Sequence, residues 1–433
     1  MTAQTPRSQR FQVHIIGRRN AGKSTLINAL TRQTVSLVSP VPGTTTDPVR
    51  KSVELPFAGP AVLVDTAGID DVGELGQARL EATARVLQQA DLVLFVRSAS
   101  DPEPAEDGLE AAWMKRLAER RLPWILVLNE ADARPADPLI SEEDLVLGVD
   151  PGIPDDIAKR LAADGMMPPT AVTSVNAASG AGINRLLAVI TKLKNTAAEE
   201  PFILGGLIRP GELVLMVMPQ DKQAPKGRLI LPQVQTLREL LDRHCMTLCV
   251  STEELPAALA ALKGPPALII TDSQVFTQVL PHVPAETRLT SFSVLFAAYK
   301  GDGAVFAEGA KHLRKLTPNS RILIAEACTH RPMNEDIGRV QLPRLLEREL
   351  GPNLQISYAQ GENWPQDLHG IDLVIHCGAC MFGRTHVQER LRQLLLAGVP
   401  ITNYGMAIAE LNQMLEHVSI PGTAASEDEG DTA

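Results

Sequence analysis

The segment from Gly17 to Ser24 constrains the fold more than any other feature of the chain. Its sequence, GRRNAGKS, matches the pattern GxxxxGK[ST], with the apolar run FQVHII before it and the amphipathic run STLINAL after it. A strand, a glycine-rich loop and a helix in this order let successive backbone N–H groups turn towards phosphate oxygens. We therefore expect a nucleotide site in which Lys23 reaches the β- and γ-phosphates and Ser24 binds Mg²⁺.

Four further segments follow in order: PGTTTD at 42–47, DTAG at 65–68, NEAD at 129–132 and NAASG at 176–180. The second and third come directly after apolar runs that read as strands, and the fourth precedes an amphipathic helix. This ordered set resembles the GTPases of the Era and TrmE type, over about residues 11–195. The resemblance implies that Thr45 supplies a hydroxyl to Mg²⁺, that Asp65 supports the Mg²⁺ indirectly, and that the Gly68 N–H binds the γ-phosphate.

The guanine end of the site also follows from this resemblance. Asn129 and Asp132 would read the base, with the Asp132 carboxylate accepting from two guanine N–H groups, and the Ala177 N–H would meet the guanine carbonyl oxygen. The family pattern NKxD carries lysine where this chain has Glu130, so we expect altered guanine affinity. The implied binding set for GTP and GDP is Gly17, Asn20, Ala21, Gly22, Lys23, Ser24, Thr25, Asp65, Gly68, Asn129, Asp132, Asn176 and Ala177.

Hydrolysis is expected to be slow. Ile69 follows Gly68, where Ras-like enzymes carry a glutamine that orients water, and an apolar side chain cannot do this. Asn20 occupies the loop position that, in TrmE-like GTPases, helps to bind K⁺ in place of an arginine finger. The expected catalytic residues are therefore Lys23, Thr45, Gly68 and Asn20, with K⁺ stimulating hydrolysis more than Na⁺. Simple hydrogen bonding within the loop is the alternative role for Asn20.

The chain has five cysteines, all at or after position 245. Few cysteines in an odd number argue against a disulfide framework and favour a reducing compartment. Two clusters, CTH at 328–330 and HCGAC at 376–380, each follow an apolar run that reads as a strand. The carboxyl ends of parallel strands gather ligand sites, so we expect the two clusters to converge. Cys245 and Cys249 are interpreted as small core residues.

The three thiols at 328–380 favour zinc, Cu(I) or an iron–sulfur centre. A closed zinc site takes four donors, and the two clusters offer five, so zinc remains open. A [4Fe–4S] cluster held by three thiolates would leave one iron with an exchangeable ligand.

A GTPase segment joined to CxH…HCxxC resembles the HydF family, the GTPase scaffolds of [FeFe]-hydrogenase maturation, over nearly the whole chain. The resemblance implies a homodimer and a [4Fe–4S] cluster bound by Cys328, Cys377 and Cys380. It implies that His330 and His376 belong to the motif, and that either acts as the exchangeable ligand or as a hydrogen-bond donor to a sulfide of the cluster. It also implies that a transient di-iron precursor arrives from two radical-SAM maturases and passes to apo-hydrogenase.

The alternation of apolar and amphipathic runs predicts an α/β protein. We expect a P-loop GTPase domain at 1–198 and a small α/β dimerisation domain at 199–287. A doubly wound α/β iron–sulfur domain would occupy 288–420, and a disordered acidic tail 421–433.

Composition bears on the function class. A net charge of −10 and 3% aromatic residues disfavour nucleic-acid binding, and the absence of a long apolar run disfavours a membrane location, so we expect a cytoplasmic protein. Two alternatives remain: a regulatory GTPase of RNA or ribosome assembly with a structural zinc module, and an iron–sulfur redox sensor that gates a GTPase.

Overall fold

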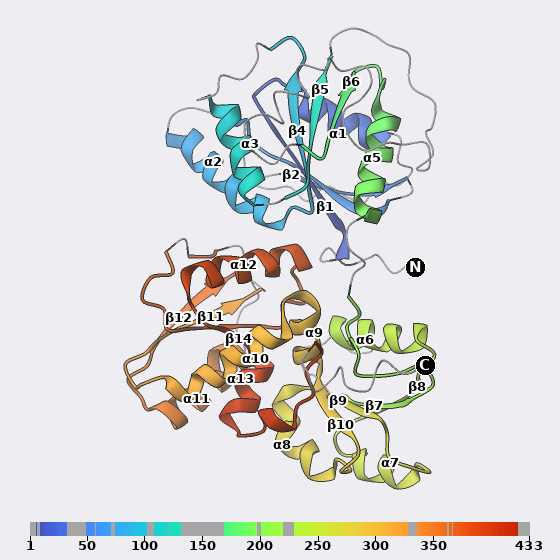
Figure 1. Cartoon of the computed structure of the whole chain (residues 1–433), viewed down its shortest axis with the longest axis vertical. Helices are drawn as coiled ribbons and strands as arrows, with labels where there is room; N and C mark the ends of the chain where they lie inside the picture. The colour runs from blue at the N-terminus through green and yellow to red at the C-terminus, as the bar shows by residue number, and fades with distance from the viewer. Residues whose placement is uncertain are drawn as a thin grey trace. The chain divides into compact units, whose positions relative to one another are not determined.

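The structure is a computed structural model, and its chain separates into two compact units, Met1–Glu199 and Glu200–Ala433 (Figure 1). It describes residues 6, 9–32, 49–56, 58–70, 74–101, 108–120, 122–130, 169–196, 201–219, 229–327, 336–361, 363–365 and 367–422. Within these ranges, no helix combines the length and the apolar character that a membrane crossing requires. The expected acidic tail lies outside the described residues, apart from its first two positions.

The first unit is built on one six-stranded sheet in the order β2-β3-β1-β4-β5-β6. The pairs are parallel except for β2 with β3, which is antiparallel. Parallel strands buried on both faces read as continuous apolar runs, which is why this sheet was recognisable in the sequence. The strands are β1 (Phe11–Gly17), β2 (Val49–Leu55), β3 (Gly59–Asp65), β4 (Leu92–Ser98), β5 (Trp124–Asn129) and β6 (Ala171–Val175).

Helices cover both faces of this sheet (Figure 1). Leu26 and Leu30 of α1 pack with α5 against Val13 and Ile15, whereas Trp113 of α3 packs with α2 on the opposite face. Successive strand residues alternate between these two layers, as a pleated strand requires. The helices are α1 (Lys23–Arg32), α2 (Glu74–Val86), α3 (Leu109–Glu119) and α5 (Ile183–Thr196).

The second unit contains two four-stranded parallel sheets, in the orders β10-β9-β7-β8 and β12-β11-β13-β14. The strands of the middle sheet are β7 (Leu213–Val217), β8 (Met246–Val250), β9 (Leu268–Thr271) and β10 (Arg288–Ser291). Those of the C-terminal sheet are β11 (Arg321–Glu326), β12 (Gln355–Gln360), β13 (Leu373–His376) and β14 (Ile401–Asn403). The expected α/β architecture is thus present in all three parts of the chain.

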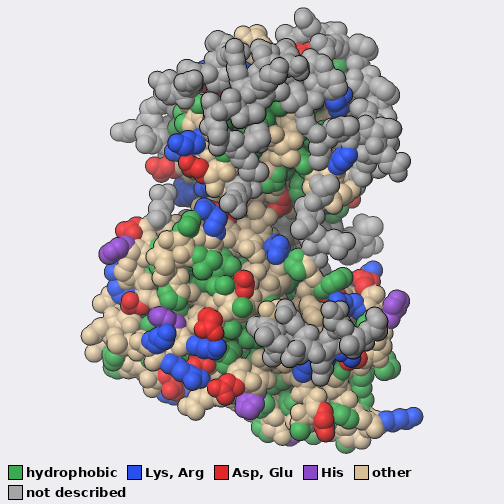
Figure 2. All heavy atoms as spheres, in the orientation of Figure 1, with side chains coloured by type: hydrophobic (Ala, Val, Ile, Leu, Met, Phe, Trp, Pro, Cys, Tyr) green, Lys and Arg blue, Asp and Glu red, His purple; other side chains and the backbone are tan. Residues whose placement is uncertain are grey.

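The helices of this unit lie on both faces of its sheets. They are α6 (Leu231–Asp242), α7 (Leu255–Ala261), α8 (Phe276–Val279), α9 (Phe292–Lys300), α10 (Gly303–Lys311), α11 (Leu342–Leu350), α12 (Arg384–Ala397) and α13 (Tyr404–Leu411). Polar residues at strand ends start two of them, since Ser291 accepts a hydrogen bond from the Val294 N–H and Asn403 accepts one from the Met406 N–H. Acidic and basic side chains are interspersed on the face of this unit drawn in Figure 2.

The middle and C-terminal sheets share one hydrophobic core. Leu215 and Ile269 from the middle sheet belong to the same contiguous cluster of buried side chains as Leu323 and Val374 from the C-terminal sheet. Burial of this apolar surface stabilises both parts together.

One strand lies in a different sheet from the one that the sequence pattern suggested. The run that starts at Arg288 was expected to open the third domain. It forms β10, which pairs with β9 in the middle sheet, and its continuation folds as α9. A short apolar run is compatible with either a strand or a helix, and periodicity alone cannot assign it to one of two neighbouring sheets.

Candidate functional site

The phosphate-binding loop connects β1 to α1, as expected. Gly17 must lack a side chain, because a Cβ there would lie 2.1 Å from the Val96 carbonyl oxygen of β4. The Lys23 ammonium folds back over the loop and donates to the carbonyl oxygens of Gly17, at 3.0 Å, and Arg18, at 2.7 Å. These contacts place a cation inside the loop, where it can meet a phosphate.

A magnesium site fits the residues at the start of α1 and the end of β3. The Ser24 hydroxyl donates to Asp65 Oδ2 at 2.9 Å. The other carboxylate oxygen, Oδ1, is buried and has no hydrogen-bond partner among the described residues. Burial raises the pKa of Asp65, while the Ser24 hydrogen bond and the Lys23 charge oppose this rise. A half-buried carboxylate beside a serine hydroxyl offers the hard oxygen ligands that Mg²⁺ prefers.

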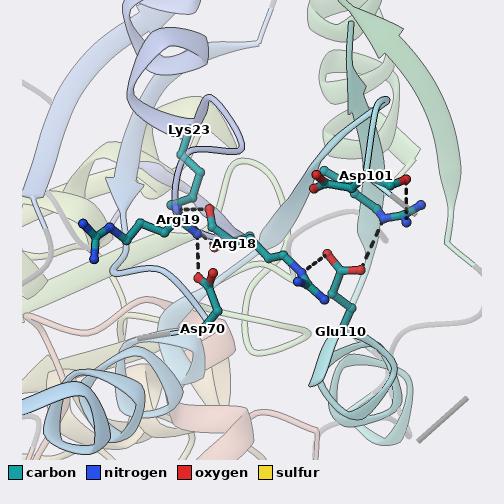
Figure 3. Close-up of polar contacts among 8 residues, drawn as sticks. Arg18, Arg19, Lys23, Asp70, Asp101 and Glu110 are labelled. Atoms are coloured by element: carbon teal, nitrogen blue, oxygen red, sulfur yellow. Dashed lines mark hydrogen bonds and ion pairs between the residues drawn. The ribbon is translucent and has the colours of Figure 1, made fainter. Parts of the chain in front are cut away.

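The segment after β3 closes against the phosphate-binding loop (Figure 3). Asp70 Oδ1 accepts a hydrogen bond from the Arg19 N–H at 2.6 Å. Gly68 lies so near this contact that a Cβ would come within 2.9 Å of Asp70 Oδ1 and 3.0 Å of the Arg19 nitrogen. Ile69 is fully buried, and its N–H donates to the Gly17 carbonyl oxygen at 3.2 Å. Its side chain therefore cannot position a water molecule.

A buried carboxylate connects the loop to α3 (Figure 3). Glu110 is 1% exposed; its Oε1 accepts from Arg18 Nε at 3.1 Å and its Oε2 from Arg97 Nε at 3.3 Å. Sequence reasoning did not identify this triad, because its members come from three elements with no motif spacing between them.

The guanine end of the site is organised by Asn129 at the end of β5. Its Nδ2 donates to the Ala21 carbonyl oxygen at 3.0 Å, and its Oδ1 accepts from the Ala177 N–H at 3.2 Å. Asn129 thus ties the phosphate-binding loop to the loop expected to meet the base. Asn176 fixes that second loop, since its Oδ1 accepts from the Ser179 N–H at 2.8 Å. Asp132 and Thr45 lie outside the described residues.

The two cysteine-bearing strand ends are adjacent, because β11 pairs with β13. The Cys377 N–H donates to the Ala325 carbonyl oxygen at 2.8 Å, and Cys377 Sγ accepts from the N–H groups of Ala327, at 3.1 Å, and Ala379, at 3.4 Å. Burial raises the pKa of the Cys377 thiol to about 11, the two N–H groups oppose this rise, and the nearby Cys380 adds to it. Two N–H donors on one sulfur suit a thiolate ligand.

His376 has hydrogen-bond partners at both ring nitrogens. Nδ1 lies 2.8 Å from the Cys377 carbonyl oxygen, and Nε2 lies 3.0 Å from Arg390 Nη1. Arginine can only donate, so Nε2 is the acceptor and Nδ1 carries the hydrogen. Burial, together with the Arg390 charge, lowers the pKa of His376 to about 3. In this arrangement the ring N–H of His376 is donated to the Cys377 carbonyl and Nε2 accepts from Arg390, so neither nitrogen contacts a thiol of the site.

The buried hydroxyl of Tyr404 is another polar group near the carboxyl ends of these strands. Tyr404, directly after β14, has no hydrogen-bond partner for its OH among the described residues. A Cβ at Gly338 would lie 2.2 Å from this OH and 2.8 Å from Glu326 Oε1, so the Tyr404 hydroxyl and the Glu326 carboxylate both lie close to Gly338. Burial raises the pKa of Tyr404 well above its ordinary value, and Cys377 and Glu326 contribute. The Tyr404 hydroxyl therefore lies near Glu326, at the carboxyl end of β11.

The described residues supply two of the three expected thiols, Cys377 and Cys380. Cys328 and His330 lie outside them, and no group of three or more possible metal-binding His, Cys, Asp or Glu side chains occurs within the described ranges. Of the two cysteines interpreted as core, Cys245 is buried, but Cys249 is exposed on the edge strand β8, so the core interpretation of Cys249 is wrong.

Three family models match successive segments of this chain, one for each of its three sheets. A model described as "50S ribosome-binding GTPase" matches residues 12–130. The model for the hydrogen maturase F dimerization domain matches residues 203–301, and the model for the hydrogen maturase F tetramerization domain matches residues 304–420. The chain belongs to the HydF family. Both HydF domains are named for self-association, which agrees with an oligomer. The dimerization domain ends at residue 301 and so includes β10 and α9.

Curated proteins named as GTPases each match part of this chain. The tRNA modification GTPase MnmE of Thermus thermophilus is 44% identical over 110 residues, which is 24% of each chain. GTPase Der of Xanthomonas oryzae is 39% identical over 132 residues, 30% of this chain and 28% of Der. This chain thus spans about a quarter of the length of these curated relatives. The structure of Aquifex aeolicus Era with GDP and AlF4⁻ is 20% identical, with a TM-score of 0.31, and covers 58% of this chain and 98% of Era.

Several residues of the HydF cysteine site were not anticipated from the sequence. Glu326 and Tyr404 stand at the carboxyl ends of β11 and β14, so the rule that sites gather there could have identified them. Arg390 lies on α12 and comes to the site through tertiary packing, with no local signal in the sequence.

Proposed function

We propose that this chain is the scaffold that binds a [4Fe–4S] cluster through Cys328, Cys377 and Cys380, receives a di-iron precursor and delivers it to apo-hydrogenase. One observation carries the proposal: the N–H of Ala327, the residue directly before Cys328, donates to Cys377 Sγ. The strand ends that precede Cys328 and Cys377 therefore lie side by side, in a chain whose last two domains match hydrogen maturase F.

The donor set suits a cluster with one replaceable ligand. Both ring nitrogens of His376 have partners, so the soft donors that the described part of this site offers are the thiols of Cys377 and Cys380. When bound through three thiolates, the cluster would supply an iron that can take a ligand from an incoming group. The chain's own residues would orient the thiolates through backbone N–H groups and shield them from water.

The GTPase unit would act as the regulator. Lys23 would hold the phosphates, Ser24 with Asp65 would support Mg²⁺, and Asn129 would hold the two nucleotide loops together. We expect slow hydrolysis, because Ile69 is buried, and stimulation by K⁺ at Asn20.

The RNA-assembly alternative has weaker support. The relatives named for tRNA modification match about a quarter of this chain, and this similarity supports GTP binding without identifying a substrate. Metal analysis of the purified chain separates zinc from iron and so tests this alternative directly.

A transfer assay tests the proposed function. Protein purified from cells that carry the two radical-SAM maturases is mixed with apo-hydrogenase, and hydrogen evolution is measured. Cys377→Ala should abolish transfer, whereas Cys249→Ala, at an exposed cysteine on β8, should retain it. Absence of hydrogenase activity with the unaltered chain would overturn the carrier function.

A further inference from the structure

Lys300 is a buried lysine that reaches from the middle domain into the cysteine loop. It is the last residue of α9 and is 4% exposed. Its ammonium donates to the carbonyl oxygens of Ala379 and Phe382, both at 2.7 Å, and lies 3.5 Å from that of Cys380. One cation thus contacts three carbonyls within a loop of four residues.

The end of α9 is held in return by side chains of the C-terminal domain. Gln388 Nε2 donates to the carbonyl oxygens of Lys300, at 3.1 Å, and Gly301, at 2.9 Å. Arg384 Nε donates to the Tyr299 carbonyl oxygen at 3.1 Å. The last carbonyls of a helix lack partners within the helix, and here α12 supplies them. The end of α9 and the cysteine loop therefore form one hydrogen-bonded structure.

The conformation of the loop explains why it needs this support. Ala379, between the two cysteines, has a φ of 51°, in the left-handed region that residues other than glycine seldom adopt. Such a conformation costs about 1 kcal/mol or more and persists only where its surroundings hold it. The Lys300 hydrogen bond to the Ala379 carbonyl is a contact of this kind.

We propose that Lys300 is a positioning residue for the cysteine site, which holds the CxxC loop in the conformation that binds metal and couples this loop to the middle domain. The inference rests on the proposed function, because the group that it positions is the cluster bound by Cys377 and Cys380. It adds a residue from outside the C-terminal domain to the support of that site.

The first test compares Lys300→Met, Lys300→Arg and the control Lys263→Met, at an exposed lysine of the same unit. Each protein is reconstituted anaerobically, and loss of iron to a chelator and the EPR spectrum of the reduced cluster are measured. Loss of a residue that orients metal ligands costs about 10-fold in metal affinity. We expect about 10-fold faster iron loss and an altered spectrum for Lys300→Met, and near-normal behaviour for the arginine variant and the control. Unchanged iron retention and spectrum in Lys300→Met would overturn the inference.

Hydrogen exchange on the unaltered chain tests the coupling without a variant. Cluster loading should protect backbone amides at 296–301 together with those at 377–382; protection of the cysteine loop alone would contradict the coupling.

If the unaltered chain binds no iron, the cluster proposal fails, and Lys300 is tested in metal-free protein. There Lys300→Met should speed exchange at the Phe382 N–H, which bonds the Ala379 carbonyl, and Lys263→Met should not. Equal exchange in all metal-free proteins would overturn the positioning role by itself.

Discussion

Asn20 has a left-handed backbone conformation, φ 64°, within the phosphate-binding loop, and its side chain is exposed. Asparagine tolerates this conformation better than most residues, so the backbone alone could account for its presence. If Asn20 instead helps to bind K⁺, the rate of GTP hydrolysis should depend on the alkali cation. GTP hydrolysis should be faster in K⁺ than in Na⁺, and Asn20→Ala should lower the K⁺ rate by about 10-fold or more, since the cation would replace an arginine finger.

The measurement is the steady-state rate at equal ionic strength in the two salts. Asn28→Ala, at an exposed asparagine of α1, is the matched control. Equal rates in K⁺ and Na⁺ for the unaltered chain would remove the K⁺ site from the mechanism.

His14 makes the first unit sensitive to acid. The residue is fully buried in β1, and burial with the nearby Arg50 charge lowers its pKa from 6.5 to about 3. Below pH 6.5 the unfolded chain binds a proton at His14 that the folded chain does not bind. The contribution of neutral His14 to the free energy of unfolding is therefore complete above pH 6.5 and is lost as the pH falls towards 3. The free energy of unfolding should fall by about 2 kcal/mol from this residue between pH 7 and pH 5.

Urea unfolding of the chain and of His14→Val at these two pH values measures the difference. The variant should lose less stability on acidification, because valine does not titrate. Parallel pH profiles for the two proteins would show that His14 is protonated in the folded state.

At the level of single residues, the sequence identified those whose role depends on local spacing. Lys23 and Ser24 follow from one motif, and Asn129 from a second. Lys23 contacts the phosphate-binding loop and Ser24 contacts Asp65, whereas the Asn129 amide contacts backbone groups of the two loops. Lys300 and Glu110 could not be found in this way. Their function depends on tertiary packing, which brings together segments that are far apart in the chain.

At the level of elements, α3 is attached to the phosphate-binding loop through Glu110. Removal of a buried partner costs about 3 kcal/mol, because it leaves a charge without its compensation. Glu110→Ala should therefore lower the free energy of unfolding of the GTPase unit by about this amount. Arg18→Ala should cost less than about 1 kcal/mol, because the Arg18 side chain is 44% exposed.

Urea unfolding of both variants checks this order, and GTP affinity measured in parallel reports whether the loop has moved. A larger loss for Arg18→Ala than for Glu110→Ala would mean that the loop, and not the buried carboxylate, limits stability.

The element pattern itself was largely predictable. Apolar runs identified the buried parallel strands because both faces of these sheets are covered. The prediction failed at β10, whose short run borders a helix, and the order of strands within each sheet does not follow from periodicity at all.

At the level of the whole molecule, the shared core predicts which fragments fold. A cut near residue 200 separates the two compact units, whereas a cut near residue 302 divides one hydrophobic cluster. Residues 201–433 should unfold cooperatively when heated. Residues 302–433 should aggregate or lack a cooperative transition, because they expose the surface that the middle sheet buries.

Circular dichroism melts of the two fragments provide the measurement. A cooperative melt of the shorter fragment would show that the C-terminal sheet is stable without the shared core.

The packing of Arg390 also provides an optical signal. Trp364 stacks on this guanidinium, with 4.4 Å between the ring centroid and Cζ, and Arg390 in turn contacts the histidine beside Cys377. Of the three tryptophans in the chain, the other two, Trp113 and Trp124, lie in the first unit. Tryptophan fluorescence from residues 201–433 thus comes from one indole, which Arg390 connects to the histidine that precedes Cys377. A coloured iron–sulfur centre there should quench this emission, so loading and unloading could be followed in real time without any label.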